Sequence, residues 1–453
     1  MNTLLTPHRR AALHEASLYL ASHPVLWLLA EAVRRVGPVV RVPPLGVVVN
    51  DPDIARAILT DETAFTKTGP GGLSHVITQV MGPYGLLNTD GPAHRALRSK
   101  LTDLFTPTTA RALTEAAFAA PLAGLTERLR RGDAVDLAAE TRALTGRMTC
   151  QLLGVAPTLG QEAATYQGVY DLSERLAGYV SIRMRPFSDA KLREVREPFD
   201  ALMDVARAAY EQSAVGSRQS AEKPEPVAAG SGPSNGDGGR CPVHVTQHAA
   251  RSTQHVPPAS VIARLRAMGL DFDEVRGVLA SLFLVGTQTV SVAVPRIVAL
   301  LVDTGQWERV RTNRALLAGA ITEGLRYTVP TPVTYRTAVA DATIGGHRFR
   351  AGSRALIFTY NTARDARAFP APLRYDPARE IPARHRTLPY GAGPHFCLGY
   401  ALAQAELHAI LTALLDAGDV RVVRRAAAYR VMLPGYRRLV VVRATPPETE
   451  TSL

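Results

Sequence analysis

The stretch LPYGAGPHFCLGYALAQAEL, residues 388–407, sets one cysteine, Cys397, in a glycine-rich loop directly before an apolar helical pattern. Gly391, Gly393 and Gly399 permit backbone conformations and close approaches that other residues resist. We expect a helix to begin just after Cys397, so that its N–H groups and positive dipole end face the sulfur and stabilise a thiolate. Residue types alone leave an alternative, a buried and inert cysteine in a turn.

The spacing within this loop favours the thiolate. The loop reads aromatic-Gly-x-Gly-x-His-x-Cys-x-Gly, carried by Tyr390, Gly391, Gly393, His395, Cys397 and Gly399. This pattern closely resembles the haem-ligand loop of the cytochrome P450 superfamily. The resemblance implies that Cys397 is the axial ligand of the iron of haem b, and that the rest of the pattern binds this cofactor.

Composition limits the classes of function. The 453 residues are 46% hydrophobic, which is ample for a large core, and the net charge of +12 suggests an anionic partner. Arginine supplies nearly all of this charge and is scattered along the chain, without the basic-aromatic interleaving that stacks nucleobases, so we expect no nucleic-acid binding. Three cysteines form no disulfide framework and fit a reducing compartment.

The apolar patch at residues 18–33 is interrupted by His23, Pro24 and Glu31. Such a patch fits an amphipathic helix better than a signal sequence or a membrane anchor. We therefore expect a soluble, cytoplasmic protein, and a monomer.

Periodicity and capping residues predict a mainly α chain with a small β-rich lobe. The resemblance implies that residues 1–453 form one haem-thiolate domain. Predicted helices cover residues 51–59, 108–131, 137–154, 160–184, 189–210 and 258–268, one long helix capped by Asp271 and Glu274, a helix ending near Tyr327, and a helix after Cys397. Predicted strands cover residues 39–42, 47–50, 334–339, 342–349, 354–358 and parts of 420–442, with Gly345-Gly346 as a hairpin turn.

Two stretches lack such patterns. Residues 67–91 hold many glycines without a period, so we expect a functional or mobile loop. Residues 213–256 are rich in Gly, Ser, Pro and Ala and predict a flexible insertion. The insertion contains Cys241, His244, His248 and His255, but without a matched second cysteine pair a surface loop is the better interpretation than a zinc site.

The long helix carries no charge from residue 277 to 295, which on hydropathy alone is marginal for a membrane span. Its centre is polar, so we expect a helix buried in a large domain instead. Pro295 should free the carbonyl of Ser291 and bend the helix.

Gly286 and Thr289 lie three apart on one helix face, which by itself is a weak signal that packing would explain. The resemblance implies that this pair holds dioxygen over the iron, with Thr289 organising proton delivery. The family usually has an acid before this threonine, where this chain has Gln288, and an amide cannot ionise to relay a proton.

His94 and Arg98, four residues apart, would in isolation be a solvated basic face. The resemblance implies instead that His94, Arg98, Arg336 and His395 bind the two haem propionates, which burial would otherwise leave unpaired. It also implies that Glu323, Arg326 and Arg379 form a buried structural network.

The resemblance implies a haem-thiolate monooxygenase that inserts one atom of dioxygen into a C–H bond by hydroxylation or epoxidation. The substrate would be a mid-sized, largely apolar small molecule of specialised metabolism. Pocket candidates are residues 73–80, 170–184, Val285, Val333 and 433–436. Electrons would come from a ferredoxin and a ferredoxin reductase, docking near Arg384 and Arg386.

Two alternatives stay open. Gln288 is compatible with oxidative coupling, ring formation or another non-hydroxylating oxidation. A haem-binding sensor or carrier without turnover is the alternative outside the enzyme class.

Overall fold

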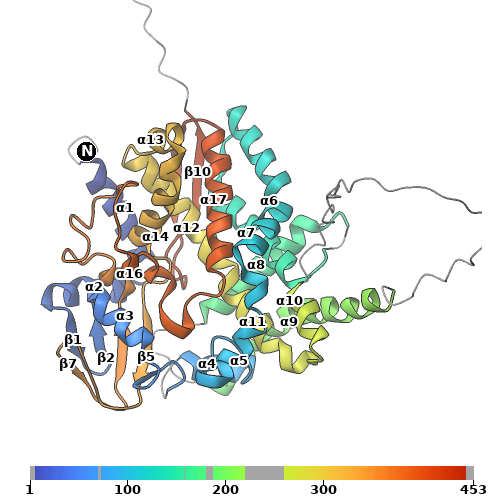
Figure 1. Cartoon of the computed structure of the whole chain (residues 1–453). Coiled ribbons are helices and arrows are strands. Elements are labelled where there is room, and N and C mark those ends of the chain that lie inside the picture. The colour runs from blue at the N-terminus through green and yellow to red at the C-terminus, as the bar shows by residue number, and fades with distance from the viewer. Residues whose placement is uncertain (1–5, 70–72, 158, 180–186, 220–259, 445–453) are drawn as a thin grey trace, which may run out of the picture.

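The computed structural model describes residues 6–69, 73–157, 159–179, 187–219 and 260–444. Strands β1 (Val39–Val42), β2 (Gly46–Val49) and β5 (Thr334–Ala338) gather at one side with helices α2 (Pro24–Val36) and α3 (Pro52–Thr60), and the long helices fill the other side (Figure 1). This arrangement confirms a mainly α protein with a small β-rich lobe. That the whole chain is one domain stays a prediction.

The remaining helices make up most of the described chain. They are α1 (Pro7–Ser22), α4 (Leu73–Met81), α5 (Gly91–Ser99), α6 (Pro107–Arg130), α7 (Leu137–Leu153), α8 (Glu162–Gly178), α9 (Asp189–Gln219), α10 (Val261–Ala267), α11 (Phe272–Gly286), α12 (Gln288–Asp303), α13 (Trp307–Thr312), α14 (Leu317–Thr328), α15 (Thr359–Thr362), α16 (Ala383–Arg386) and α17 (Tyr400–Asp416). Short 3₁₀ turns cover η1 (Thr102–Phe105), η2 (Arg314–Leu316), η3 (Leu388–Tyr390) and η4 (Gly393–His395).

The described strands form three small sheets. A five-stranded sheet has the order β1-β2-β8-β5-β3, where β3 is Phe65–Thr66 and β8 is Arg354–Ile357, and only the β2–β8 pair in it is parallel. Strands β4 (Val135–Asp136), β10 (Tyr436–Arg443) and β9 (Val420–Ala427) form the second sheet, and β6 (Ala342–Ile344) with β7 (His347–Phe349) form a hairpin.

Several element boundaries follow from local chemistry that the sequence shows. The Asp51 side chain accepts hydrogen bonds from the first turn of α3, and Asp271 and Glu274 form the predicted capping box at α11. Gly345 and Gly346, at φ 56° and 78°, make the predicted two-residue turn between β6 and β7. These predictions are confirmed.

The predicted long central helix is interrupted at Thr287, where α11 ends and α12 begins. Gly286 adds backbone freedom there, and the Thr287 hydroxyl donates to the Phe283 carbonyl at 3.0 Å, which competes with the helical ladder. Residues 272–303 are long and apolar enough to span a membrane, but 78% of their most apolar stretch is buried inside the protein. The prediction of a buried helix is therefore confirmed.

Pro295 has the predicted effect on its partner carbonyl. The Ser291 carbonyl, which has no N–H to accept from at Pro295, instead accepts a hydrogen bond from the Thr141 hydroxyl at 3.1 Å. This bond joins α12 to α7 in the interior.

Two predicted boundaries are wrong. Residues 67–91 contain helix α4, because the apolar residues after residue 72 have a helical spacing that the surrounding glycines obscure. Helix α9 continues to Gln219, so residues 213–219 are helical and not part of a flexible insertion. The rest of the predicted insertion, from residue 220, lies outside the described residues, as do residues 180–184 of the predicted helix 160–184.

Glu406 is buried on α17, and burial raises the pKa of its carboxyl to about 8. The folded protein therefore keeps the Glu406 carboxyl protonated at pH values where the unfolded chain releases this proton. The free energy of unfolding falls as pH rises from about 4.5 to about 8. At pH 9 we expect Glu406→Gln to raise the melting temperature and to increase the free energy of unfolding by an amount on the order of 4 kcal/mol. At pH 4 we expect the substitution to leave the melting temperature unchanged.

Differential scanning calorimetry across this pH range tests the expectation. Glu115→Gln on the exposed face of α6 is the control and should shift nothing at either pH. An equal effect of Glu406→Gln at pH 4 and pH 9 would contradict a protonated, buried carboxyl.

Candidate functional site

Two glycines allow the loop before Cys397 to press against α3. Gly391 and Gly393 have φ values of 82° and 68°, and a Cβ at Gly393 would lie 2.5 Å from the Leu59 carbonyl oxygen. Gly399 differs from the prediction, because its φ is −81° and a Cβ there would meet no described atom within 4 Å. Gly399 therefore leaves open space beside the loop, because it has no side chain.

Three aromatic rings cluster in and just after the cysteine loop. The Cys397 N–H donates to the Tyr390 carbonyl at 3.0 Å, directly before α17 begins. The Tyr390 ring meets the Tyr400 ring edge-on with centroids 4.9 Å apart, and its hydroxyl accepts a 2.8 Å hydrogen bond from Gln404. Phe396 lies 5.3 Å from Tyr400, which completes the cluster.

The electrostatics of Cys397 differ in part from the prediction. Burial raises the pKa of its thiol, while the Gly399 N–H and the Arg98 guanidinium lower it, and the net direction is upward. A backbone N–H just after Cys397 thus favours the thiolate as expected and Arg98 adds to it, but desolvation outweighs both. A metal ion bound at this sulfur would favour the thiolate.

Asp90 joins three separate segments beside the cysteine loop. Its Oδ1 accepts hydrogen bonds from the His395 ring at 2.8 Å and the Gly91 N–H at 2.9 Å. Its Oδ2 accepts from the Thr66 hydroxyl and the Lys67 N–H, both at 2.7 Å. Burial opposes ionisation, but these bonds, first that of His395, hold the pKa of Asp90 well below its usual range. Strand β3, helix α5 and the cysteine loop are thereby fixed together.

The structure brings the four predicted propionate-binding residues into one cluster, in which His94, His395 and Arg336 interact with this carboxylate and Arg98 interacts with His94. The His94 and His395 rings lie 4.0 Å apart, and burial with His395 and Lys67 nearby lowers the pKa of His94 to about 3. Arg98 interacts with Cys397, and Arg336 is 6% exposed.

Lys67 is a member of this cluster that the sequence analysis missed. Burial, followed by the effect of Arg336, lowers the pKa of its amine to about 7, with Arg98 acting in the same direction. Lys67 was overlooked because it begins the stretch interpreted as a loop. The available signal was that it is one of only four lysines in the chain and directly follows an apolar-polar strand pattern.

The cluster fits a ligand with two carboxylates. Arg98 and Arg336 carry two positive charges, the Lys67 amine adds a third when it is protonated, and Asp90 is the one acid among the groups that perturb Lys67 in the described part of the chain. The Nδ1 atom of His395 is buried without a hydrogen-bond partner among the described residues. Buried guanidinium groups require an anionic partner, and haem propionates meet that need.

Gly286 ends α11 and Thr289 lies in the first turn of α12, on either side of the interruption at Thr287, so their predicted placement on one helix face stays a prediction. Neighbouring Val285 is 39% exposed on a helix that is otherwise mostly buried, and Gly286 is exposed beside it. A Cβ at Gly286 would come no closer than 3.9 Å to Thr149 Oγ1, so the notch at this glycine is open. The Thr289 hydroxyl donates to the Val285 carbonyl at 3.3 Å.

Gln288, directly before Thr289, is buried. It is 4% exposed, and it lines a cavity of about 190 Å³ together with Tyr170, Glu174 and Ser291. The Tyr170 hydroxyl and Ser291 Oγ lie 3.2 Å apart, whereas Gln288 Nε2 has no hydrogen-bond partner in the described structure. This cavity wall is polar, so the predicted largely apolar pocket has a polar side.

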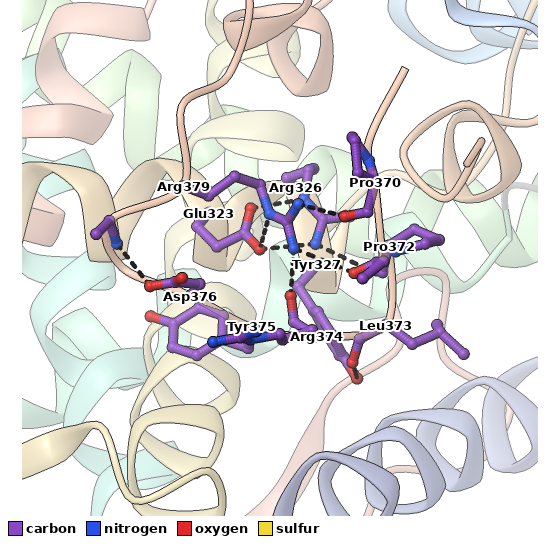
Figure 2. A network of polar contacts seen from close by, with 12 residues as sticks. Glu323, Arg326, Tyr327, Pro370, Pro372, Leu373, Arg374, Tyr375, Asp376 and Arg379 are labelled. Carbon is purple, nitrogen blue, oxygen red and sulfur yellow. Dashed lines mark hydrogen bonds and ion pairs between the residues drawn. The ribbon is translucent and has the colours of Figure 1, made fainter. Parts of the chain in front are cut away.

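The predicted Glu323 network is present and buried (Figure 2). Arg326 donates to the two carboxylate oxygens at 2.6 and 2.8 Å, and Arg379 donates to Oε1 at 2.8 Å. Arg379 also donates to the carbonyls of Pro370, Ala371 and Arg374. The network therefore fixes residues 370–379 onto α14.

The weak zinc pattern at Cys241, His244, His248 and His255 lies outside the described residues. Among the residues that the structure does describe, no group of three or more His, Cys, Asp or Glu side chains is placed to hold a metal ion.

Comparisons with known proteins agree with this site. The family model described as Cytochrome P450 matches residues 306–427. A curated relative, the 20-oxo-5-O-mycaminosyltylactone 23-monooxygenase of Streptomyces fradiae, is 34% identical over 35% of this chain and 37% of its own length. Cytochrome P450 CYP199A2 of Rhodopseudomonas palustris is 26% identical over 90% of this chain and 86% of its own. This chain spans about a third of the length of the first two curated relatives that it matches, one of which is the Streptomyces fradiae enzyme.

Solved structures share the fold. CYP109B1 from Bacillus subtilis matches with a TM-score of 0.69 at 21% identity, over 93% of this chain and all of its own. CYP109E1 from Bacillus megaterium, solved with testosterone, matches with a TM-score of 0.70 at 19% identity, over 94% of this chain and all of its own. Since the fold, the cysteine loop and the matched family model agree, the chain belongs to the cytochrome P450 family.

Proposed function

We propose that this protein is a haem-thiolate monooxygenase that inserts one oxygen atom from dioxygen into a C–H bond of a small molecule, by hydroxylation or epoxidation. The observation that carries the proposal is the convergence of His94, Arg98, Arg336 and His395 around Asp90 beside Cys397. These residues are far apart in the sequence, and their surplus charge suits haem propionates.

Haem b would be held by Cys397 at the iron and by the cationic cluster at the propionates, with Tyr390, Gly391 and Gly399 shaping the loop. When bound, the cofactor supplies the binding and reduction of dioxygen. Arg98, through its charge, would favour the thiolate form of Cys397. The Tyr390 cluster would exclude water from the sulfur.

On the central helix, the open notch at Gly286 leaves room beside the Thr289 hydroxyl. The Thr289 oxygen can accept a proton from water while its own proton is passed on, because a hydroxyl is both donor and acceptor. Gln288 would orient water in its polar cavity through Nε2 but cannot ionise. We therefore propose that Thr289 carries proton delivery and that Gln288 supports it through water.

Lys67 extends the propionate site. We expect Lys67→Met to speed haem transfer to excess apomyoglobin by about tenfold, the equivalent of one lost charge-assisted contact of about 1.4 kcal/mol. Lys191→Met is the matched control, because Lys191 is exposed and pairs with Glu194 on α9. Equal transfer rates for both variants would exclude Lys67 from the site.

We propose a mid-sized, largely apolar substrate of specialised metabolism. Relatives support this class by their names, which include a monooxygenase acting on 20-oxo-5-O-mycaminosyltylactone and a vitamin D3 dihydroxylase. The polar cavity at Gln288 and Tyr170 adds the expectation that this substrate carries an oxygen-bearing group.

Electrons would come from a ferredoxin and its reductase, and the protein would act in the cytoplasm as a monomer. Arg384, at the predicted docking side, is 61% exposed but pairs with Asp53 at 2.8 Å, while Arg386 donates to the Ile381 carbonyl. An acidic ferredoxin would thus compete with Asp53 for Arg384.

Oxidative coupling is the second candidate, favoured by the amide at Gln288. Turnover with ferredoxin, ferredoxin reductase, NADPH and ¹⁸O-labelled dioxygen separates the two reactions. Monooxygenation places one labelled atom in the product, whereas coupling yields a product that has lost hydrogen and gained no label.

A further inference from the structure

Arg296 is a fully buried arginine on α12, about two helical turns beyond Thr289. A guanidinium at such a depth has lost its hydration and must be compensated by a counter-charge and by hydrogen-bond acceptors. Its partners come from three other parts of the chain.

The counter-charge comes from the N-terminal helix α1. Arg296 Nε donates to Glu15 Oε2 at 3.3 Å, and Nη2 donates to Glu15 Oε1 and, at 2.9 Å, to the Tyr19 hydroxyl. Glu15 is itself buried, with 5% of its side chain exposed. Although burial opposes it, Glu15 and Tyr19 raise the pKa of Arg296, so the guanidinium stays charged.

The remaining acceptors are backbone carbonyls of two loops. Arg296 Nη1 donates to the Pro434 carbonyl at 2.9 Å, and Nη2 donates to the Thr328 carbonyl. The Tyr19 hydroxyl bonds the Thr328 carbonyl as well, and approaches the Val329 carbonyl at 3.1 Å. Val329 has a φ of 35°, a left-handed conformation that a β-branched residue resists and that its surroundings must hold.

Both loops carry residues that the sequence predicts to line the substrate pocket, Val333 in one and residues 433–436 in the other. Residues 329–333 lead from α14 into β5, and the turn containing Pro434 connects β9 to β10. Leu433 and Gly435 line the cavity of about 190 Å³ beside Gln288. A Cβ at Gly435 would lie 3.1 Å from Val292 Cγ1, so this turn packs directly on α12.

We propose that Arg296 is a positioning residue that holds residues 328–333 and the turn at Pro434 as two walls of the substrate pocket, and thereby sets which ligand shapes fit. The inference rests on the proposed function, because the pocket belongs to that reaction. Only arginine offers donors in a planar fork that can reach Glu15 and two carbonyls at once. Lysine keeps the charge but not the fork.

Hydrogen exchange followed by mass spectrometry tests the positioning directly, on the holoenzyme. In Arg296→Met we expect faster exchange in peptides covering both walls, and unchanged exchange in α5 and the cysteine loop. Arg311→Met is the control, because Arg311 makes its ion pair with Asp419 at the surface. Unchanged exchange in either wall would overturn the proposal.

Two azole probes test the consequence for ligand shape. Imidazole needs only the open coordination position, whereas 4-phenylimidazole also contacts the pocket walls. We expect Arg296→Met to weaken 4-phenylimidazole by about tenfold while imidazole changes by less than about twofold, with Arg296→Lys intermediate. A merely structural role would weaken both probes equally or neither, and either result would overturn the proposal.

If Arg296→Met does not fold, Tyr19→Phe replaces it, since this variant removes only the hydroxyl that bonds Arg296 and the two carbonyls. It should produce the same exchange pattern and probe selectivity to a smaller degree, and their absence would count against the proposal. A failure of the wild-type protein to form a thiolate-ligated haem would instead refute the proposed function, so the two failures are distinguishable.

Discussion

Replacing Cys397 by serine is expected to abolish the red-shifted Soret band that the reduced carbon-monoxide complex of a thiolate-ligated haem shows, and to reduce turnover below detection. A serine hydroxyl does not replace a thiolate as electron donor to the iron. The loop should survive, because its main contacts are the Cys397 N–H to the Tyr390 carbonyl and the positive-φ glycines, which the substitution leaves in place.

Cys150→Ala is the matched control for this prediction. Cys150 is buried on α7, and burial raises the pKa of its thiol to about 12, so it is an inert core residue. Its spectrum should equal that of the wild type. A Cys397→Ser variant that keeps the red-shifted band would place the ligand elsewhere in the chain.

Replacing Glu323 by glutamine is expected to lower the free energy of unfolding by about 3–5 kcal/mol, because it leaves Arg326 and Arg379 buried beside a neutral amide. Figure 2 shows both guanidinium groups directed at this one carboxylate. The loosened segment, residues 370–379, precedes the cysteine loop, so haem should also be lost more readily.

Urea unfolding monitored by circular dichroism measures this effect. Asp341→Asn breaks the exposed Arg348–Asp341 pair, and because solvent screens this pair the substitution should leave the free energy of unfolding nearly unchanged. If Glu323→Gln cost no more than this surface control, the network would not be an essential part of the fold.

Local chemistry made much of the fold predictable. Asp51, Asp271 and the Gly345-Gly346 pair determine how their elements begin or turn through contacts within a few residues, and each lies where expected. The four propionate residues could be named only by resemblance, since no local rule connects His94 with Arg336. Their convergence depends on Asp90, whose bonds join three segments.

Other features depend on tertiary structure and could not be predicted. The rarity of lysine and the strand pattern before Lys67 mark the residue but not its buried environment, which arises only when Arg98 and Arg336 fold against it. The partners of Arg296 come from opposite ends of the chain, Glu15 and Pro434, which no periodicity connects. Helix α4 was hidden because the glycines around it dominate a short window.

The most direct test of the account is the absorption spectrum of the purified protein after haem loading, reduction and exposure to carbon monoxide. We predict the red-shifted Soret band of a thiolate-ligated haem in the wild type and its loss in Cys397→Ser. A band at the position of a histidine-ligated haem, or no stable haem complex at all, would contradict the assignment of Cys397 and the function built on it.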